Sequence, residues 1–159
     1  MKRACVIGWP IAHSRSPLIH GYWLRHYGID GAYTKEAVAA GDVTAFLSSL
    51  AERGYSGCNV TVPHKETAFA QAGFKDPSAV AIGAANTVWL QDGQIACSNT
   101  DTYGFITNLT HTVPRWINTP GSALVLGAGG SARAIVHGLL TSGRRDIRIF
   151  NRVKSRADA

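Results

Sequence analysis

The sequence predicts an α/β protein with two consecutive units. Short runs of apolar and β-branched residues alternate with segments of helical periodicity, as strands and helices do in a layered fold. A hairpin signal at Asp92-Gly93 interrupts the alternation, and a glycine-rich turn at 127–133 joins a buried strand to a helix. We therefore expect a three-layer α/β unit with a mixed, mainly parallel sheet over residues 1–105. The first β-α-β unit of a second domain follows over 106–159.

The composition is typical of a folded globular protein. Hydrophobic residues make up 45% of the 159 residues and charged residues 16%. The net charge of +6 permits an anionic ligand. The basic residues are scattered except over 144–156, a cluster that fits either a phosphate site or a solvated helix end. Aromatic stacking platforms and a continuous basic face are lacking, so we expect no nucleic-acid binding.

The cysteines and the N-terminus predict a cytoplasmic protein. Cys5, Cys58 and Cys97 are odd in number and lie far apart in strand-like runs, which favours buried, reduced thiols over a disulfide or a metal site. No apolar run approaches the roughly 18 residues that a membrane span needs. Met1-Lys2-Arg3 leads directly into a strand and does not resemble a signal peptide. We therefore expect no membrane association and no metal.

The elements are expected in the following order. The first unit should hold strands at 3–9, 32–38 and 57–62, helices at 17–27, 43–53, 64–72 and 77–84, a hairpin of 86–90 with 94–98, and a helix at 102–109. Ser16 fits the N-cap of the first helix, and Asp92-Gly93 suits a type I′ turn. After a connector at 110–120, the second unit should hold a strand at 122–126, a helix at 134–140 and a strand at 146–150.

The stretch from Gly57 to Lys65 is the first candidate for chemistry. A β-branched strand ends at Pro63 and brings Lys65 into the first turn of a helix. The helix dipole makes an ammonium mildly unfavourable there, so this placement suggests a functional site. A surface lysine beside a strand-to-helix turn explains the stretch equally well.

Polar residues gather at the carboxyl ends of the predicted strands, where open α/β sheets bind ligands. Hydroxyls, amides, one ammonium and one carboxylate would suit a small polyhydroxylated acid. Each residue also has a local structural explanation, such as a helix cap or a turn. The candidates for this substrate site are Ser14, Ser16, Asn59, Thr61, Lys65, Asn86 and Asp101.

The glycine-rich turn predicts a dinucleotide site in a Rossmann-like domain. Glycines at 127 and 129 allow a tight turn and close approach of a pyrophosphate to the following helix N-terminus. Ala132 replaces the third glycine of the usual pattern, but it is still small enough for close helix–sheet packing. The cofactor candidates in the turn are Gly127, Ala128, Gly129, Gly130, Ser131 and Ala132.

The end of the second strand favours NADP over NAD. An NAD enzyme places a carboxylate there against the ribose 2′-hydroxyl. This chain has Asn151 and Arg152 instead, with Lys154 and Arg156 close by. Guanidinium groups pair bidentately with phosphate, so Asn151, Arg152 and Arg156 are candidates for the 2′-phosphate site.

Five motifs together resemble those of the shikimate dehydrogenase family, in the family's order and spacing. They are His13-Ser14-Arg15-Ser16-Pro17, Asn59-Val60-Thr61-Val62-Pro63-His64-Lys65, Gly83-Ala84-Ala85-Asn86-Thr87, Asn99-Thr100-Asp101-Thr102-Tyr103-Gly104 and Gly127-Ala128-Gly129-Gly130-Ser131-Ala132-Arg133. The resemblance implies reversible, NADP-dependent reduction of 3-dehydroshikimate to shikimate, a step of the chorismate and aromatic amino-acid pathway. It further implies that 1–105 is a substrate-binding and catalytic domain and 106–159 the N-terminal part of an NADP-binding domain.

The resemblance also assigns roles. It implies that Lys65 is the catalytic lysine, that Thr61, Asn86 and Asp101 bind the substrate, and that Ser14 and Ser16 hold its carboxylate. We expect Lys65 to act as general acid and base and Asp101 mainly to orient the reacting hydroxyl and the lysine. Val153 departs from the family's threonine and removes one hydroxyl near the 2′-phosphate. The alternatives are a quinate/shikimate dehydrogenase that prefers NAD, or a substrate-binding fragment without full activity. The oligomeric state is expected to be monomer or homodimer.

Overall fold

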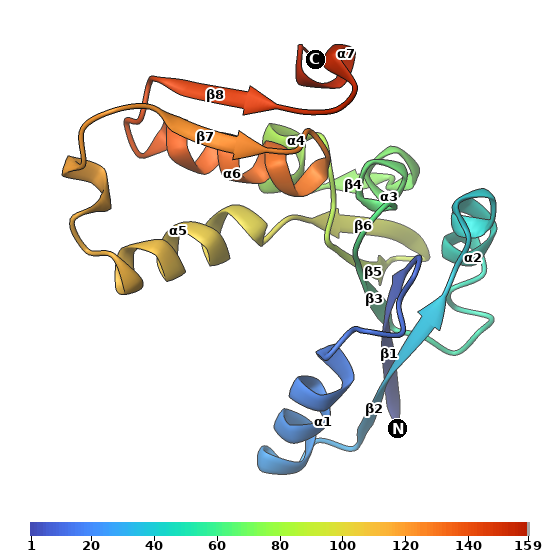
Figure 1. Cartoon of the computed structure of the whole chain (residues 1–159). Helices are drawn as coiled ribbons and strands as arrows, with labels where there is room; N and C mark the ends of the chain where they lie inside the picture. Colours follow the sequence, from blue (N-terminus) through green and yellow to red (C-terminus); the bar gives the residue numbers. More distant parts are fainter. Residues whose placement is uncertain (159) are drawn as a thin grey trace.

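The computed structural model describes residues 1–158, arranged as two units joined by one long helix (Figure 1). The strands of the first unit are β1 (Lys2–Gly8), β2 (Gly31–Ala37), β3 (Gly57–Val60), β4 (Phe74–Lys75), β5 (Thr87–Gln91) and β6 (Gln94–Ser98). Its helices are α1 (Ser16–His26), η1 (Ala40–Asp42), α2 (Val43–Ser48), α3 (Lys65–Gln71) and α4 (Pro77–Ile82). There follow α5 (Asp101–Thr112), η2 (Trp116–Asn118), β7 (Ala123–Leu126), α6 (Gly130–Thr141), β8 (Ile147–Phe150) and α7 (Lys154–Ala157).

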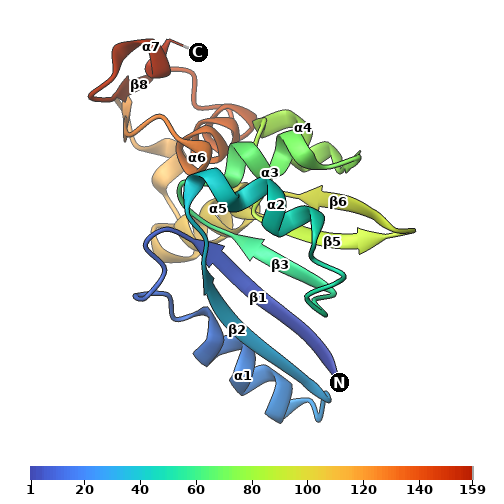
Figure 2. The ribbon, with the colours of Figure 1, turned by 90° about the vertical axis from the view of Figure 1, so that its right-hand side faces the viewer.

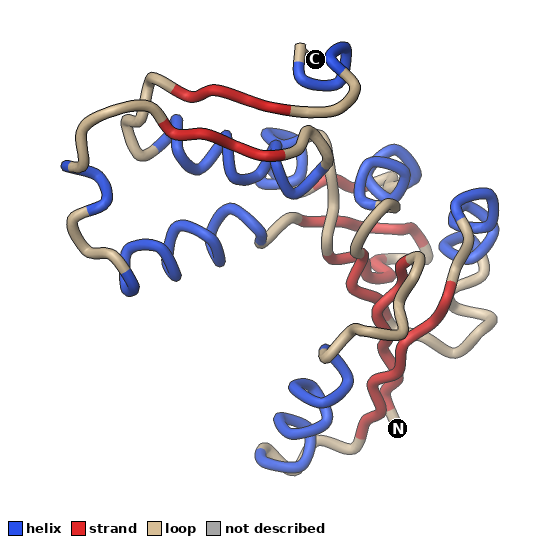
Figure 3. The backbone as a smooth tube through the Cα atoms, viewed as in Figure 1, coloured by secondary structure: helices blue, strands red, loops and turns tan. Residues whose placement is uncertain are grey.

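The sheet of the first unit is mixed and mainly parallel, as predicted. Its strand order is β2-β1-β3-β5-β6-β4. Strand β1 pairs in parallel with β2 and β3, and β4 pairs in parallel with β6, whereas β5 is antiparallel to both of its neighbours. Because β1 and β3 are parallel, the loops that follow them leave the sheet at the same edge (Figure 3).

Helices cover both faces of this sheet, which gives the three layers. Figure 2 looks onto the face that α2 and α3 cover, and α1 lies on the opposite face. The packed core lies on the α2–α3 side, where Ile7 of β1, Leu47 of α2 and Ala68 of α3 are almost fully buried. On the other side, α1 and the sheet enclose an apolar groove of about 450 Å³. The core therefore fixes the position of α3, whose first residue is Lys65.

The second unit is a β-α-β element packed against α5. Strands β7 and β8 are parallel, with Ala123 opposite Ile147. The hydroxyl of Thr102 in α5 donates to the carbonyl oxygen of Ala134 in α6 at 2.8 Å. The helices approach so closely that a Cβ at Gly138 would lie 2.8 Å from the Ile106 side chain. The predicted boundary between 105 and 106 falls inside α5 and stays a prediction.

Several local expectations were wrong. Helix α2 ends at Ser48 and not near 53, and hydrogen-bonded turns continue the chain to Gly54. Helix α5 runs to Thr112, past the expected end at 109, and stops before Pro114. Ser16 lies inside α1, and its backbone N–H donates to the Ser14 hydroxyl, so it is not the N-cap.

Other expectations were confirmed, and two short elements were missed. Asp92 and Gly93 have φ values of 50° and 76°, as the predicted type I′ turn requires. All three cysteines are buried. The two residues of β4 and the four of α7 are too few to give a periodic signal in the sequence.

Among residues 1–158, no helix is long and apolar enough to cross a membrane. The part of the chain that the structure describes also contains no cluster of three or more His, Cys, Asp or Glu side chains that could hold a metal ion.

Candidate active site

Lys65 lies in the first turn of α3, as the sequence predicted, and only 8% of it is exposed. The helix begins at Lys65 itself, one residue later than the expected start at 64. The turn from β3 to α3 is held at two points. The backbone N–H of Thr61 donates to the carbonyl oxygen of Ile7, and the buried ring of His64 donates from Nε2 to the carbonyl oxygen of Val38 at 2.7 Å. The turn that precedes Lys65 is thus anchored to the sheet and to the segment before α2.

The Lys65 ammonium forms an ion pair with Asp101. Lys65 Nζ lies 2.5 Å from Asp101 Oδ2, and the exposed fractions of the two side chains are 10% and 25%. The other carboxylate oxygen of Asp101 accepts a hydrogen bond from Asn86 Nδ2 at 2.8 Å. Three residues predicted from separate motifs therefore meet. Partial burial strengthens such a charge-assisted pair because little water competes for the charges.

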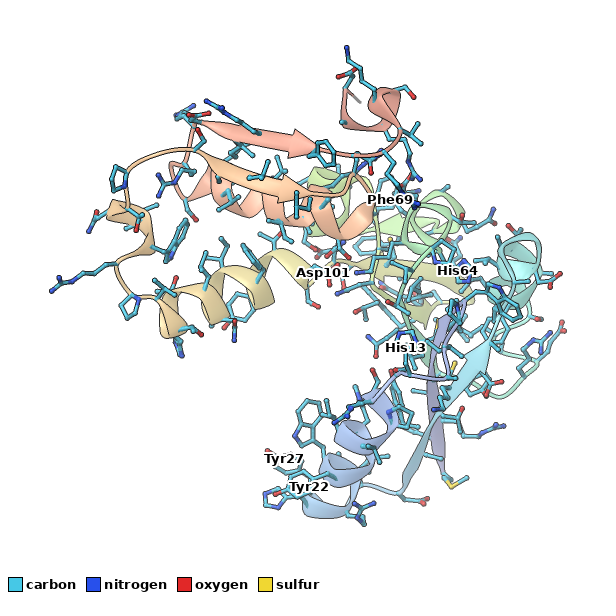
Figure 4. All side chains as sticks on the ribbon, in the orientation of Figure 1. His13, Tyr22, Tyr27, His64, Phe69 and Asp101 are labelled. Atoms are coloured by element: carbon cyan, nitrogen blue, oxygen red, sulfur yellow. The ribbon has the colours of Figure 1, made fainter. Side chains whose placement is uncertain are left out.

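Backbone and side-chain amides hold Asp101 in place. Its backbone N–H donates to Asn99 Oδ1 at 2.9 Å, and the buried Asn99 amide donates to the carbonyl oxygen of Ala84 at 2.8 Å. Asn86 Oδ1 accepts from the backbone N–H of Thr100 at 3.1 Å. The turn before α5 is thus tied to the loop after α4. Figure 4 shows Asp101 at the start of α5, far from Tyr22 and Tyr27 on α1.

Asn59 connects this network to β2. The Tyr33 phenol donates to Asn59 Oδ1 at 2.6 Å, and Asn59 Nδ2 donates to the Thr87 hydroxyl at 3.3 Å. Burial of Tyr33, with smaller effects from the nearby cysteines, raises the pKa of its phenol. The Asn86 carbonyl oxygen, which can only accept, receives a hydrogen bond from Asn59 Nδ2 at 3.4 Å and therefore fixes which way the Asn59 amide faces.

The remaining substrate candidates lie beside the network, and one of them, Ser16, lies next to the Tyr33 phenol. The Ser14 and Ser16 hydroxyls are 3.3 Å apart in the loop that leads from β1 into α1. Thr61 lies in the turn before α3, and its methyl group faces Gly8. These three residues thus lie in the loops after β1 and β3, at the same edge of the sheet.

The glycine-rich turn fits a dinucleotide phosphate. Gly127 has a φ of 117°, in the left-handed region that favours glycine. Within residues 1–158, no atom beyond the adjoining residues lies within 4 Å of a Cβ placed on Gly127 or Gly129. Helix α6 begins directly after the turn, so its N–H groups and its dipole face the same space. A backbone open in this way could approach a pyrophosphate.

The turn also contacts the catalytic candidate. A Cβ at Gly130 would lie 3.0 Å from Lys65 Cβ and 3.1 Å from Ala84 Cβ. Ser131, predicted only as a cofactor residue, accepts a hydrogen bond from Lys65 Nζ at 2.9 Å. Candidates from both predicted units therefore meet at one ammonium group.

The basic residues at the C-terminal end are arranged in two ways. Asn151 donates to the carbonyl oxygen of Val153 at 2.8 Å, directly after β8. Arg156 pairs instead with Glu66 of α3, with 3.1 Å between Nη2 and Oε1, and Arg133 lies 3.9 Å from the same carboxylate. Arg152 is exposed. Both arginines of the 2′-phosphate prediction thus lie near the end of β8.

Sequence reasoning did not identify the supporting residues. The roles of Tyr33, Asn99 and Thr87 depend on contacts between elements far apart in the chain. The parallel register gives one signal for Tyr33. Tyr33 of β2 lies opposite Ala4 of β1, and Asn59 of β3 lies opposite Val6. Positions 4 and 6 of β1 point to the same face of the sheet, so the side chains of Tyr33 and Asn59 lie on that face as well.

Comparison with known sequences identifies the family. The family model described as the shikimate dehydrogenase substrate binding domain matches residues 6–88, which is 83 of the 159 residues. The chain is 50% identical over 159 residues to the shikimate dehydrogenase (NADP(+)) of Azorhizobium caulinodans, covering all of this chain and 57% of that protein. It is 51% identical over 156 residues to that of Mesorhizobium japonicum, covering 98% and 55%. The chain thus spans about half the length of the curated relatives it matches.

Solved structures extend the likeness over both units. Shikimate dehydrogenase from Aquifex aeolicus matches with a TM-score of 0.89 at 32% identity, over 99% of this chain and 58% of that one. Shikimate 5-dehydrogenase from Thermus thermophilus, solved in complex with NADP(H) and shikimate, matches with a TM-score of 0.83 at 36% identity, over 99% and 58%. With the match of the family model, these likenesses show that the chain belongs to the shikimate dehydrogenase family.

Proposed function

We propose that this chain carries the substrate site and the first part of the cofactor site of an enzyme that reversibly reduces 3-dehydroshikimate to shikimate with NADPH. The single observation that supports this most is the Lys65–Asp101 pair beneath the N-terminus of α6. It brings a proton donor to the place where a dinucleotide turn ends. The curated relatives carry the name shikimate dehydrogenase (NADP(+)), which agrees with this assignment.

The residues present fit the cofactor. Gly127 and Gly129 leave the backbone of the turn open, and α6 offers its N-terminus to a pyrophosphate. At the end of β8, Arg152 forms no ion pair with a carboxylate of the described residues. We assign the pyrophosphate to the backbone N–H groups of residues 127–132 and the 2′-phosphate to Asn151, Arg152 and Arg156. When bound, NADPH supplies the hydride that the reduction needs. Arg156 must then leave Glu66 or share its guanidinium between the two anions.

Lys65 is the proposed general acid. As a hydride reaches the carbonyl carbon of 3-dehydroshikimate, one N–H proton of the Lys65 ammonium passes to the carbonyl oxygen, which becomes the hydroxyl of shikimate. In the reverse direction the Lys65 amine takes that proton back. Asp101 orients both the lysine and the reacting hydroxyl, because its two oxygens are already held by Lys65 and Asn86. Ser14 and Ser16 are assigned to the carboxylate of the substrate, and Asn59 and Thr61 are assigned as further substrate contacts.

The test compares Lys65→Ala with its parent in an extended chain. Residues 1–159 are fused to the part of the Azorhizobium caulinodans relative that lies beyond the match. We expect kcat to fall by about 10²- to 10⁴-fold, the usual contribution of general acid–base catalysis, with shikimate affinity largely kept. The control is Lys2→Ala, which removes an exposed lysine of β1. Retained turnover in Lys65→Ala would overturn the assignment.

The same proteins decide between the alternatives. Rates are measured with shikimate and with quinate, each with NADP and with NAD. They test the preference for NADP over NAD, which Arg152 favours and the absence of a hydroxyl at Val153 weakens. The 159-residue chain is assayed beside the extended chain, with shikimate binding measured by calorimetry. Binding without turnover in the shorter chain would assign it the role of a substrate-binding fragment.

A further inference from the structure

The Lys65 ammonium has three N–H donors, and two of them have acceptors from different parts of the chain. Asp101 Oδ2 lies at 2.5 Å and Ser131 Oγ at 2.9 Å from Nζ. Within residues 1–158, no third acceptor reaches Nζ. Tetrahedral geometry at nitrogen therefore leaves one donor position for a ligand. We propose that Ser131 is a positioning residue of the proton transfer, an inference that rests on the function proposed above.

The position of Ser131 is fixed by packing. Gly130, the residue before it, lies so close to Lys65 and Ala84 that no side chain would fit without a shift. The first turn of α6 is further held by the hydrogen bond from Thr102 to Ala134. Glu66, the residue after Lys65, pairs with Arg133 two positions past Ser131. Contacts on several sides of Ser131 thus hold its hydroxyl against Nζ.

Two acceptors at fixed positions, Asp101 and Ser131, determine where the proton that Lys65 transfers lies. In the ammonium form, Asp101 and Ser131 each accept one N–H, and the third N–H occupies the open position. After that proton has passed to the substrate oxygen, the neutral amine keeps its two N–H bonds to the same acceptors. Its lone pair then occupies the open position and can receive the proton in the reverse reaction. With Asp101 alone, Nζ would rotate about the Cε–Nζ bond, and the proton would be aligned for only part of the time.

This role differs from the cofactor contact that the glycine-rich turn predicts for Ser131. A residue that only binds cofactor affects the KM for NADP. A residue that orients the acid affects kcat and leaves both KM values in place. Ser131 also links the two units, so the ammonium is held in this way only while the N-terminus of α6 lies against α3.

The first experiment measures kinetics in the extended chain described above. We expect Ser131→Ala to lower kcat about 10-fold, the loss associated with one hydrogen bond to a charged group, and to change the KM for shikimate and for NADP by less than about twofold. Ser131→Thr keeps the hydroxyl and should recover most of kcat. The matched control is Ser142→Ala, which removes a hydroxyl bonded to the Gly138 carbonyl at the other end of α6. An unchanged kcat in Ser131→Ala, or a rise confined to the KM for NADP, would overturn the proposal.

The second experiment needs no turnover and uses the 159-residue chain itself. Acetylation of Lys65 by acetic anhydride at fixed pH is followed by mass spectrometry of its peptide, with the acetylation of Lys2 as the internal reference. Loss of one hydrogen bond frees the amine, so we expect acetylation of Lys65 to rise at least about threefold in Ser131→Ala and not in Ser131→Thr. Equal acetylation in all variants would show that the hydrogen bond from Lys65 to Ser131 does not hold the ammonium in solution, and the proposal would be wrong. If the extended parent shows no turnover, the proposed function fails and the positioning role fails with it, whereas this measurement still decides whether Ser131 holds the Lys65 ammonium.

Discussion

Asp101 is held by more partners than an ordinary surface carboxylate. Lys65, Asn86 and its own backbone contact with Asn99 fix both oxygens and the start of α5. An exposed ion pair usually contributes little, since water screens it and the side chains lose freedom. This pair is partly buried and both oxygens of its carboxylate accept hydrogen bonds, so its geometry is well defined.

Replacing the charge without changing the shape tests this point. We expect Asp101→Asn in the extended chain to lower kcat about 10- to 100-fold, because a neutral amide holds the ammonium less firmly than a carboxylate does. The fold should be kept, since the side chains have nearly the same volume. The control is Asp92→Asn in the β5–β6 turn, where φ is positive and asparagine is tolerated. Equal rates for the two variants would show that the Asp101 charge has no part in turnover.

At the scale of elements, the contact between α6 and α3 decides whether the two predicted sites become one. Helix α3 is positioned by the core of the first unit, and α6 by its packing against α5. Gly130 lies where the two helices start. A glycine in the first position of a helix after a glycine-rich turn is usually explained by phosphate binding. Here Gly130 also lets the backbone of α6 approach Lys65 closely.

Gly130→Ala should separate the two helices. The added Cβ would lie 3.0 Å from Lys65 Cβ, and both neighbours belong to packed elements that cannot move freely. Overpacking of this kind typically costs about 1–3 kcal/mol of unfolding free energy, and the Ser131 contact should be lost with it. The matched control is Gly104→Ala in α5. Among the described residues, nothing beyond the helix's own backbone and the adjoining residues lies within 4 Å of a Cβ there, and alanine should stabilise the helix.

Thermal unfolding of the two variants measures this difference directly. We expect Gly130→Ala to lower the melting temperature of the 159-residue chain and Gly104→Ala to raise it or leave it unchanged. Acetylation of Lys65 should also rise in Gly130→Ala. A melting temperature for Gly130→Ala at or above that of the parent would contradict the close approach.

At the scale of the whole molecule, three buried thiols lie in line across the sheet. The strand register places Cys5 opposite Cys58, Cys58 opposite Val88, and Val88 opposite Cys97. Residues opposite one another point to the same face, which is the face packed against α2 and α3. A hydrogen bond with Cys5 and burial raise the pKa of the Cys58 thiol, and burial raises the pKa of Cys97.

These raised pKa values predict a loss of stability at alkaline pH. Below about pH 8.5, the ordinary pKa of a free thiol, both thiols are protonated in the folded and the unfolded chain, so neither changes the unfolding free energy. Above it the unfolded chain loses protons that the folded chain keeps, and the unfolding free energy falls by up to about 1.4 kcal/mol per pH unit for each thiol. Urea unfolding at pH 7.5, 9 and 10 measures the slope.

Cys58→Val is the control for this prediction, because it has a similar volume and no titrating group. Its unfolding free energy should fall less steeply above pH 9 than that of the parent, whereas lysine and tyrosine ionisation contributes equally to both. Identical slopes would show that Cys58 does not stay protonated in the folded chain.

The sequence by itself determined most of the elements and the candidates for chemistry. Alternating periodicity predicted the mixed sheet, Asp92-Gly93 predicted the hairpin turn, and the position of Lys65 at the start of α3 followed from the strand and proline before it. These are local properties, because backbone preferences and side-chain periodicity act within a few residues. The motifs then predicted which family the chain resembles.

Only the tertiary structure decided which candidates meet. Ser131 comes 66 positions after Lys65, and Tyr33 comes 26 before Asn59, so no local rule pairs them. Their contacts depend on the strand order β2-β1-β3 and on the packing of α6 between β7 and α5. The physical reason is that the free energy of such contacts comes from burial between elements, which the sequence specifies only through the fold as a whole.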